Sequence, residues 1–171
     1  MAEARDNHIT IEVDTLANEL ENKMRSTNLN MSPKCSIFKV PNILSRHNSK
    51  AYAPNSFSIG PYHYRKQHLQ STQNIKLKYL HDLIGTFPGA YPKAMLRTLV
   101  GAISEVEQEA RDCYAEPIDH IRKDELVKIL LLDGSFLIEL FRKNADKKLR
   151  EDNDPNFTMN CMNQFLSHDL I

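Results

Sequence analysis

Glycine is scarce in this chain, with only five residues in 171, and a scarcity of this kind is typical of a helix-rich fold. The chain also lacks an excess of charge of either sign, because 22 lysines and arginines balance 22 aspartates and glutamates. A balanced chain has no overall field that would attract nucleic acid or an anionic membrane. We therefore expect no binding to nucleic acid.

Cysteine is rare as well, and Cys35, Cys113 and Cys161 lie far apart in the sequence. An odd, widely spaced set excludes the disulfide framework of small secreted proteins, and no Cys-x-x-Cys motif is present. Two interpretations stay open. Either all three are reduced, mostly buried thiols, or two form a disulfide and one is spare.

Long apolar segments are missing too. The first six residues, MAEARD, contain no apolar signal-peptide core, and the longest aliphatic run, Ile129–Leu132, is ended by Asp133. A membrane-spanning helix needs roughly 20 apolar residues. We expect this chain by itself to be soluble and cytoplasmic, without inserting into a membrane. No glycine-rich phosphate loop and no context for a Ser/His/Asp triad is present, so we predict no catalytic, cofactor-binding or metal residues.

Apolar residues recur at helical spacing in several segments, which predicts an all-α fold with little or no regular sheet. The expected helices cover approximately residues 9–24, 66–87, 92–114 and 124–143, and a last one starts at Phe157. In the third, Glu105, Glu107, Glu109 and Arg111 are expected to lie mainly outside.

The chain divides into residues 1–34, an amphipathic helix and a polar linker, and residues 35–171, the main domain. The apolar face of the first helix consists of Ile9, Val13, Leu16, Leu20 and Met24. This helix either packs on the main body or acts as a mobile arm.

An extended, proline-rich segment over residues 37–68 is expected to lie across the helices. Pro41, Pro54 and Pro61 each fix the backbone and disfavour helix in the preceding residue. Gly60, before Pro61, marks a turn that needs backbone angles closed to other residues. The apolar residues expected to hold the segment on the core are Ile37, Phe38, Val40, Ile43 and Leu44.

Asp133 is the most informative single residue, because it lies on the most apolar helical face of the chain, between Leu126 and Phe141. A carboxylate there must be paired, hydrogen-bonded or protonated. The favoured hypothesis is a buried anchor that holds backbone amides or an arginine of the 37–68 segment. The alternative is a tuned acid or base, but no nucleophile or second carboxylate lies at a suggestive spacing.

Other polar residues have structural explanations. His63 and His68, with His81, lack the spacing and the accompanying ligands of a metal site. Cys113 near Arg111 could be a reactive thiol, but a packed Cys113 with a paired Arg111 is favoured. Basic residues at Arg65, Lys66, Lys76, Lys78, Lys147, Lys148 and Arg150 are interpreted as solvated faces.

Several motifs, taken in order, resemble the opening of a plant family called domain of unknown function 247. They are IFKVP (37–41), AYAP (51–54), SIGPYH (58–63), His68-Leu69, and Lys76 with Tyr79-Leu80. Further matches are AR-x-CY (110–114), LDGSFLIEL (132–140) and HDLI (168–171). Thr72-Gln73 departs from the Met-Glu usual in the family, which removes an acidic residue and any ion pair it makes.

The resemblance implies a longer plant protein with a C-terminal membrane anchor, no established activity, and, in some grasses, an association with self-incompatibility. The family continues after Ile171 into a Leu-Glu-Asn-Gln-x-Pro motif, so we expect the chain to be either a fragment or a truncated gene product.

The expected function is a non-enzymatic recognition or scaffold module with a protein partner. Without the remaining half, the face between Leu126 and Phe141 is expected to be partly exposed and to favour self-association. The alternatives are an enzyme whose site the remaining half completes, or a remnant without function.

Overall fold

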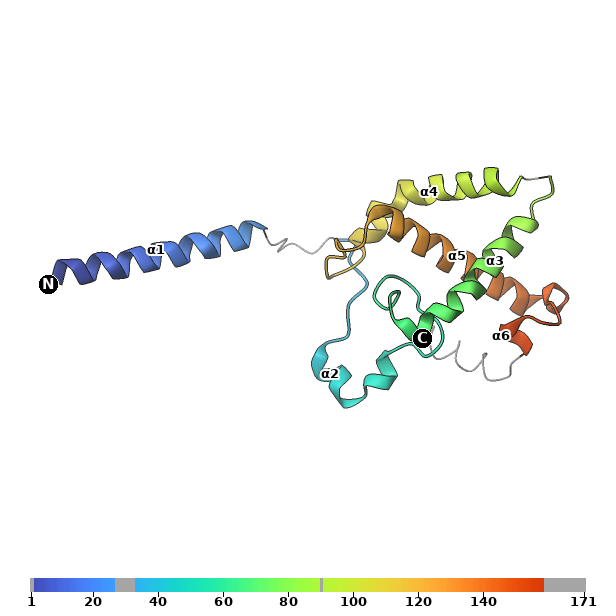
Figure 1. Ribbon diagram of the computed structural model, residues 1–171, viewed down its shortest axis with the longest axis horizontal. Helices are drawn as coiled ribbons and strands as arrows, with labels where there is room; N and C mark the ends of the chain where they lie inside the picture. Colours follow the sequence, from blue (N-terminus) through green and yellow to red (C-terminus); the bar gives the residue numbers. More distant parts are fainter. Residues whose placement is uncertain (1, 27–32, 90, 159–171) are drawn as a thin grey trace.

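A computed structural model describes residues 2–26, 33–89 and 91–158, and the regular structure there is helical (Figure 1). Within these residues the one strand-like pairing is an isolated parallel bridge between Ile37 and Tyr114. The predicted all-α fold is confirmed. The helices are α1 (Ala2–Ser26), α2 (Asn42–His47), α3 (Gln73–Gly85), α4 (Pro92–Asp112), α5 (Lys123–Ala145) and α6 (Pro155–Thr158), with 3₁₀ turns η1 (Ser49–Tyr52), η2 (Gln67–Thr72) and η3 (Lys147–Leu149).

The core is built around α5, which α3 and α4 both contact (Figure 1). Three apolar clusters follow one another along this helix. Ile118 and Ile121 pack near its start, Leu80 and Ile84 of α3 pack at its middle, and Phe57 and Tyr79 pack toward its end. Because one helix contributes to all three clusters, the face predicted for residues 124–143 is mostly buried.

The ends of α5 suit the helix dipole. Asp124 and Glu125 lie in its first turn, and Arg142 and Lys143 lie in its last turn. Acids at the positive end and bases at the negative end each stabilise a helix by roughly 0.3–1 kcal/mol. No side chain caps the N-terminus of α5, so the two acids of the first turn provide the stabilisation of that end that a capping side chain would otherwise give.

The predicted boundaries of α4 are confirmed, and Pro92 occupies its first turn, where a missing N–H costs nothing. One expectation for this helix was wrong. Glu107, predicted to lie outside, is buried and pairs with Arg111, whose side chain was expected outside as well but is only 16% exposed. Helical spacing placed it next to the apolar face, and the pairing with arginine is what allows the carboxylate to be buried there.

The single helix predicted for residues 66–87 is instead two elements, the 3₁₀ turn η2 followed by α3. The side-chain oxygen of Thr72 donates a hydrogen bond to the carbonyl of Leu69 at the junction. Gln73, the first residue of α3, has a side-chain amide whose two polar atoms are buried without a hydrogen-bond partner in the described part of the chain.

The 37–68 segment is less extended than predicted, since it contains α2 and η1. The apolar residues expected to hold it on the core are mostly exposed, Phe38 at 60% and Ile43 at 70%. The attachment lies further along the chain, where the fully buried Phe57 stacks on Phe136 with ring centroids 4.7 Å apart. The buried Phe57 and the hydrogen-bonded turn after it hold the middle of the segment on the core, and the backbone bridge between Ile37 and Tyr114 holds its start.

The first helix is confirmed as α1, although it begins at Ala2 rather than near Ile9, and it extends away from the rest of the chain in Figure 1. Val13, Leu16, Leu20 and Met24 are all more than half exposed. The side chain of Ile9, Cys161 and most of the last predicted helix, including Met159, Met162, Phe165, Leu166 and Leu170, lie outside the described residues.

Candidate functional site

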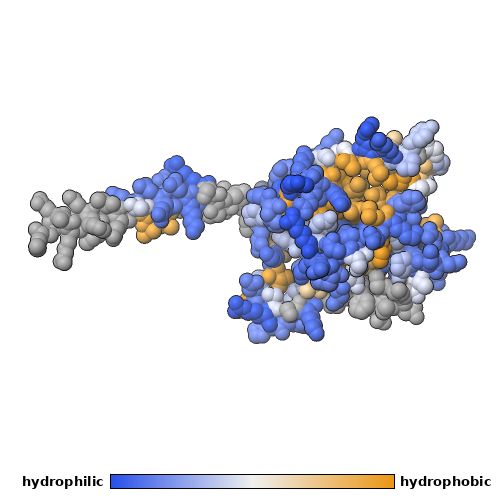
Figure 2. Space-filling view, viewed as in Figure 1, coloured by the Kyte–Doolittle hydropathy of each residue, from blue (hydrophilic) through white to orange (hydrophobic). Residues whose placement is uncertain are grey.

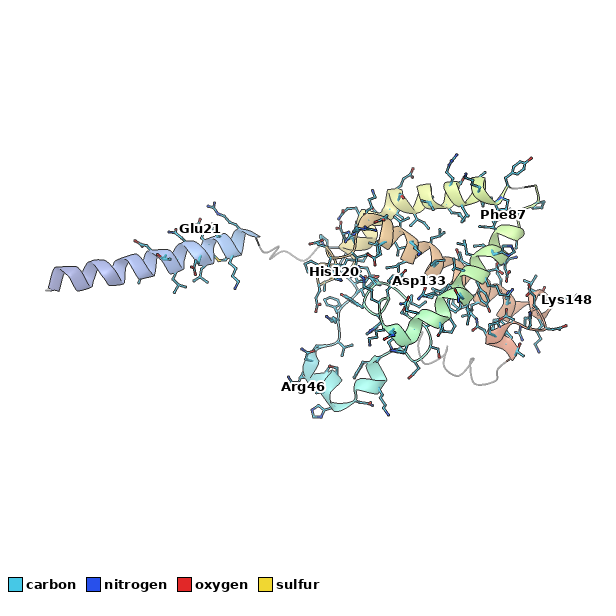
Figure 3. All side chains as sticks on the ribbon, viewed as in Figure 1. Glu21, Arg46, Phe87, His120, Asp133 and Lys148 are labelled. Carbon is cyan, nitrogen blue, oxygen red and sulfur yellow. The ribbon has the colours of Figure 1, made fainter. Side chains whose placement is uncertain are left out.

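Asp133, labelled in Figure 3, lies on α5 and contacts two other parts of the chain. Its Oδ2 accepts a hydrogen bond from the backbone N–H of Gly60 at 2.7 Å, and its Oδ1 pairs with Lys76 Nζ at 2.5 Å. The same Nζ donates to the carbonyl oxygen of Ser58 at 2.5 Å. The predicted anchor is therefore confirmed in its backbone-amide form, and its cation is a lysine of α3 rather than an arginine.

We call this three-part contact the Asp133 clasp, and its side chains are almost completely shielded from solvent. The side chain of Lys76 is 0% exposed and that of Asp133 is 7% exposed. Burial raises the pKa of Asp133, while the charge and hydrogen bond of Lys76 and the amide of Gly60 oppose that rise. Both carboxylate oxygens are occupied by donors, so the arrangement holds the 58–60 turn against α3 and α5.

A second buried cluster, which the sequence reasoning missed, surrounds Lys143 at the end of α5. Lys143 Nζ pairs with Asp82 at 2.7 Å and with Asp154 at 2.9 Å, and it lies 4.2 Å from the ring centroid of Tyr79. The hydroxyl of Tyr79 donates to Asp154 at 2.8 Å and accepts from Asn156. We call this set the Lys143 cluster.

In the Lys143 cluster, the pKa shifts of Asp82 and Lys143 both favour the charged forms that make the ion pair. For Asp82, burial would raise the pKa, but Lys143 and Lys78 outweigh it and lower the pKa below its usual value. For Lys143, burial would lower the pKa, but Asp82 and Asp154 raise it. Burial raises the pKa of Tyr79 far above that of a free tyrosine. The cluster therefore joins α3, α5 and the 154–156 turn as a charged structural unit.

A signal for both clusters was present in the sequence. Lys76 and Tyr79 belong to one motif of the family resemblance, yet Lys76 was interpreted as part of a solvated face and is fully buried. Asp154 was noted only as turn punctuation before Pro155. Spacing three residues apart places Lys76 and Tyr79 on one face of α3, and that face points into the core.

The remaining candidates are not brought together. Arg111 pairs with Glu107 and donates to the carbonyls of Ile118 and Ile121, as the paired interpretation predicted. The Sγ of Cys113 donates to Glu109 O at 3.3 Å, and Cys113 and Cys35 are both free thiols.

His63 is half-buried, burial lowers its pKa, and its Nδ1 has no partner, whereas His68 contacts the carbonyl of Pro54. The side chain of His81 is 89% exposed. Among the described residues, no three His, Cys, Asp or Glu side chains are grouped as a metal site would require.

Two open grooves lie on the surface, and neither contains Asp133 or His63. One, about 540 Å³, lies between α4 and α5 where Figure 2 shows an apolar patch, and its lining is Val100, Ser104, Lys123, Asp124, Val127, Lys128 and Leu131. The other, about 360 Å³, lies between α3 and α4, and its lining is Leu77, Leu80, His81, Ile84, Gly85, Phe87, Pro92 and Leu96. Both surfaces are mainly aliphatic, so they suit apolar side chains of a partner better than a polar substrate.

Comparison with known proteins places these features in context. The family model described as plant protein of unknown function, domain of unknown function 247, matches residues 37–171. UPF0481 protein At3g47200 of Arabidopsis thaliana is 31% identical over 138 residues, covering 80% of this chain and 28% of the relative. Putative UPF0481 protein At3g02645, from the same plant, is 31% identical over 114 residues, covering 67% of this chain and 21% of the relative.

This chain thus spans less than a third of the length of either relative. No solved structure matches it. Among the described helices, none combines the length and the apolar character needed to cross a bilayer.

Proposed function

The chain belongs to the plant family of domain of unknown function 247, and we propose that it serves as a protein-recognition or scaffold module rather than as an enzyme. Its buried ionisable groups hold the fold together, and its open grooves offer apolar surface to a protein partner.

The observation that carries the proposal is that the candidate catalytic side chains are buried and paired, away from the open grooves. The side chains of Asp133, Lys76 and Lys143 are each at most 7% exposed, and each is paired inside the molecule. A general acid or base must reach a substrate proton to within hydrogen-bonding distance. Both oxygens of Asp133 already accept hydrogen bonds from Gly60 and Lys76, which favours an anchor over the enzyme alternative.

The groove between α3 and α4 is the surface we assign to an external partner. Leu77 and Phe87 line it and are 50% and 45% exposed, and Tyr91, next to the lining residue Pro92, is 81% exposed. Aromatic and aliphatic side chains gathered around an apolar hollow are typical of the centre of a protein interface. A partner helix presenting apolar side chains would fill such a hollow.

The cellular setting follows from the family resemblance. The resemblance implies a C-terminal membrane-spanning helix in the whole protein, and we propose that this module lies on the cytoplasmic side of that membrane. There it would present its grooves to partners in signalling or self-recognition. Fractionating tissue and locating the whole protein by immunoblot would test this placement, and recovery only in the soluble fraction would contradict the anchor.

The experiment that tests recognition is site-specific photo-crosslinking in the whole protein, expressed in plant cells. A photoreactive phenylalanine replaces Leu77 in the groove, and the matched control replaces Glu105, an exposed residue of α4 outside both groove linings. We expect a discrete crosslinked polypeptide from position 77 and none from position 105.

A second variant links the crosslink to the groove. Leu96→Asp places a charge in the lining and should abolish crosslinking from position 77, while circular dichroism checks that the helices persist. Equal crosslinking from positions 77 and 105, or crosslinking that Leu96→Asp leaves unchanged, would refute the assignment.

A further inference from the structure

We propose that α1 docks, with its apolar stripe facing inward, into the groove between α4 and α5 of its own chain. This goes beyond the proposed function, because it concerns a different groove and requires no outside partner. In the arrangement of Figure 1, α1 lies apart from that groove. The proposal therefore adds a second, closed arrangement of the same chain.

The stripe and the groove are both incomplete apolar surfaces of similar length. Val13, Leu16, Leu20 and Met24 are 52–59% exposed along one side of α1, a span of about 16 Å at roughly 1.5 Å per residue. The groove follows α5 from Lys123 to Leu131, about 12 Å on the same basis. A helix carrying apolar residues at this spacing is the ordinary occupant of a groove between two helices.

The segment that follows α1 is attached to the main body near this groove. The amides of Ser36 and Ile37 both donate to the carbonyl of Cys113, at 3.0 and 2.9 Å, and Lys34 pairs with Glu109 at 2.6 Å. From this attachment, Ser104 is about 14 Å back along α4. The chain between the end of α1 and Ser36 can reach about 33 Å when extended. The stripe and the groove are thus held at high local concentration.

The charges at the groove and on α1 are of opposite sign. Lys123 and Lys128 are exposed at the groove and pair with no acid among the described residues, whereas Asp124 is already paired with Arg122 at 2.9 Å. On α1, Asp14 and Glu19 lie on opposite flanks of the stripe. Both lysines belong to α5, so docking the stripe would bring the carboxylate of one flank to them, which favours this helix over a basic or neutral one.

A disulfide trap tests the contact directly in the full chain. Leu16→Cys and Ser104→Cys are introduced after replacing Cys35, Cys113 and Cys161 with serine, and the dilute protein is oxidised. We expect an internally crosslinked monomer on a non-reducing gel. The matched control, Asn18→Cys with Ser104→Cys, places the thiol on the opposite side of α1 and should remain uncrosslinked. A crosslinked dimer would assign the groove to α1 of a second copy, and no crosslink would overturn the proposal.

A second measurement needs no change to the cysteines. Leu16→Asp with Leu20→Asp should release α1 and raise the fluorescence of the dye ANS, which binds exposed apolar surface. Asn18→Asp with Asn22→Asp adds the same charge to the opposite side and should leave the fluorescence unchanged. Because all four positions are exposed on α1, the main body should fold in both variants. Equal fluorescence in the two double variants would count against docking.

Discussion

The backbone amide of Gly60 donates a hydrogen bond to the carboxylate of Asp133, 73 residues further along the chain, at 2.7 Å. Gly60 has a positive φ of 76°, a conformation that side-chain-bearing residues rarely adopt. The turn can therefore aim its amide at α5 only because position 60 is glycine. Lys76 completes the contact from α3, so one carboxylate fixes the relation of a loop to two helices.

Asp133→Ala should lower the free energy of unfolding by about 3–5 kcal/mol, because it leaves the charge of Lys76 buried without a counter-ion. Urea denaturation followed by circular dichroism measures the change. An unchanged midpoint would disprove the anchor role.

Two controls separate pairing from general damage to the fold. Asp124→Ala removes an exposed carboxylate of the same helix whose pair with Arg122 is solvated, and it should cost at most about 1 kcal/mol. Lys76→Met with Asp133→Leu removes both charges and should recover much of the loss. A double variant as unstable as Asp133→Ala would place the effect in the shape of the site rather than in its charge.

Gly60→Ala and Gly101→Ala should change stability in opposite directions. A Cβ at position 60 would lie 2.9 Å from the hydroxyl of Tyr114 on a backbone of positive φ, so alanine should destabilise there. Gly101 lies inside α4, where a Cβ would meet nothing within 4 Å, and alanine should stabilise by about 0.5–1 kcal/mol. Thermal melts of both variants provide the test, and a shift in the same direction for both would contradict the assignment.

The sequence predicted best the helices that have either a strong apolar periodicity or a proline at their start. The periodicity around Leu126–Phe141 and the proline at position 92 predicted α5 and α4 closely. The break between η2 and α3 was not predictable, because Gln67–Thr72 contains neither glycine nor proline, and the 3₁₀ geometry depends on local hydrogen bonds such as that of Thr72.

The sequence predicted the central residue of the candidate site but not the residues that contact it. Asp133 stood out because an acid within an apolar face must have a partner. The spacing of Lys76 and Tyr79 places both on one face of α3, but it does not pair Lys76 with Asp133. Lys76 and Gly60 are brought near Asp133 only by tertiary packing. The same holds for Lys143 and Asp154, which look like ordinary charges of a helix end and a turn.

The Lys143 cluster should make stability depend on pH at both extremes. The folded pKa of Asp82 is lowered below 3.8, so its contribution is present above that pH and is lost as pH falls through the lowered value. The folded pKa of Lys143 is raised above 10.5, so its contribution is present below that pH and is lost as pH rises through the raised value. Urea midpoints measured across the pH range should show both losses.

Asp82→Asn isolates the acid part of that profile, because other carboxylates also titrate there and the raised pKa of Asp133 acts in the opposite direction. The difference between the natural chain and this variant should be constant from neutral pH down to about the ordinary pKa of aspartate, and should shrink below it. A difference that is independent of pH would mean that Asp82 contributes by packing alone.

Self-association of this chain should depend on two exposed residues of α5. Most of the face between Leu126 and Phe141 is buried, but Ile138 and Phe141 remain 50% and 62% exposed, one helical turn apart. Adjacent exposed apolar side chains favour association, so sedimentation equilibrium should give an average mass that rises with concentration.

Ile138→Lys with Phe141→Lys should abolish that rise. Phe38→Lys with Ile43→Lys, at positions 60% and 70% exposed outside α5, makes the same change in charge and should leave it in place. A chain that is monomeric at every concentration would show that these two side chains do not drive association.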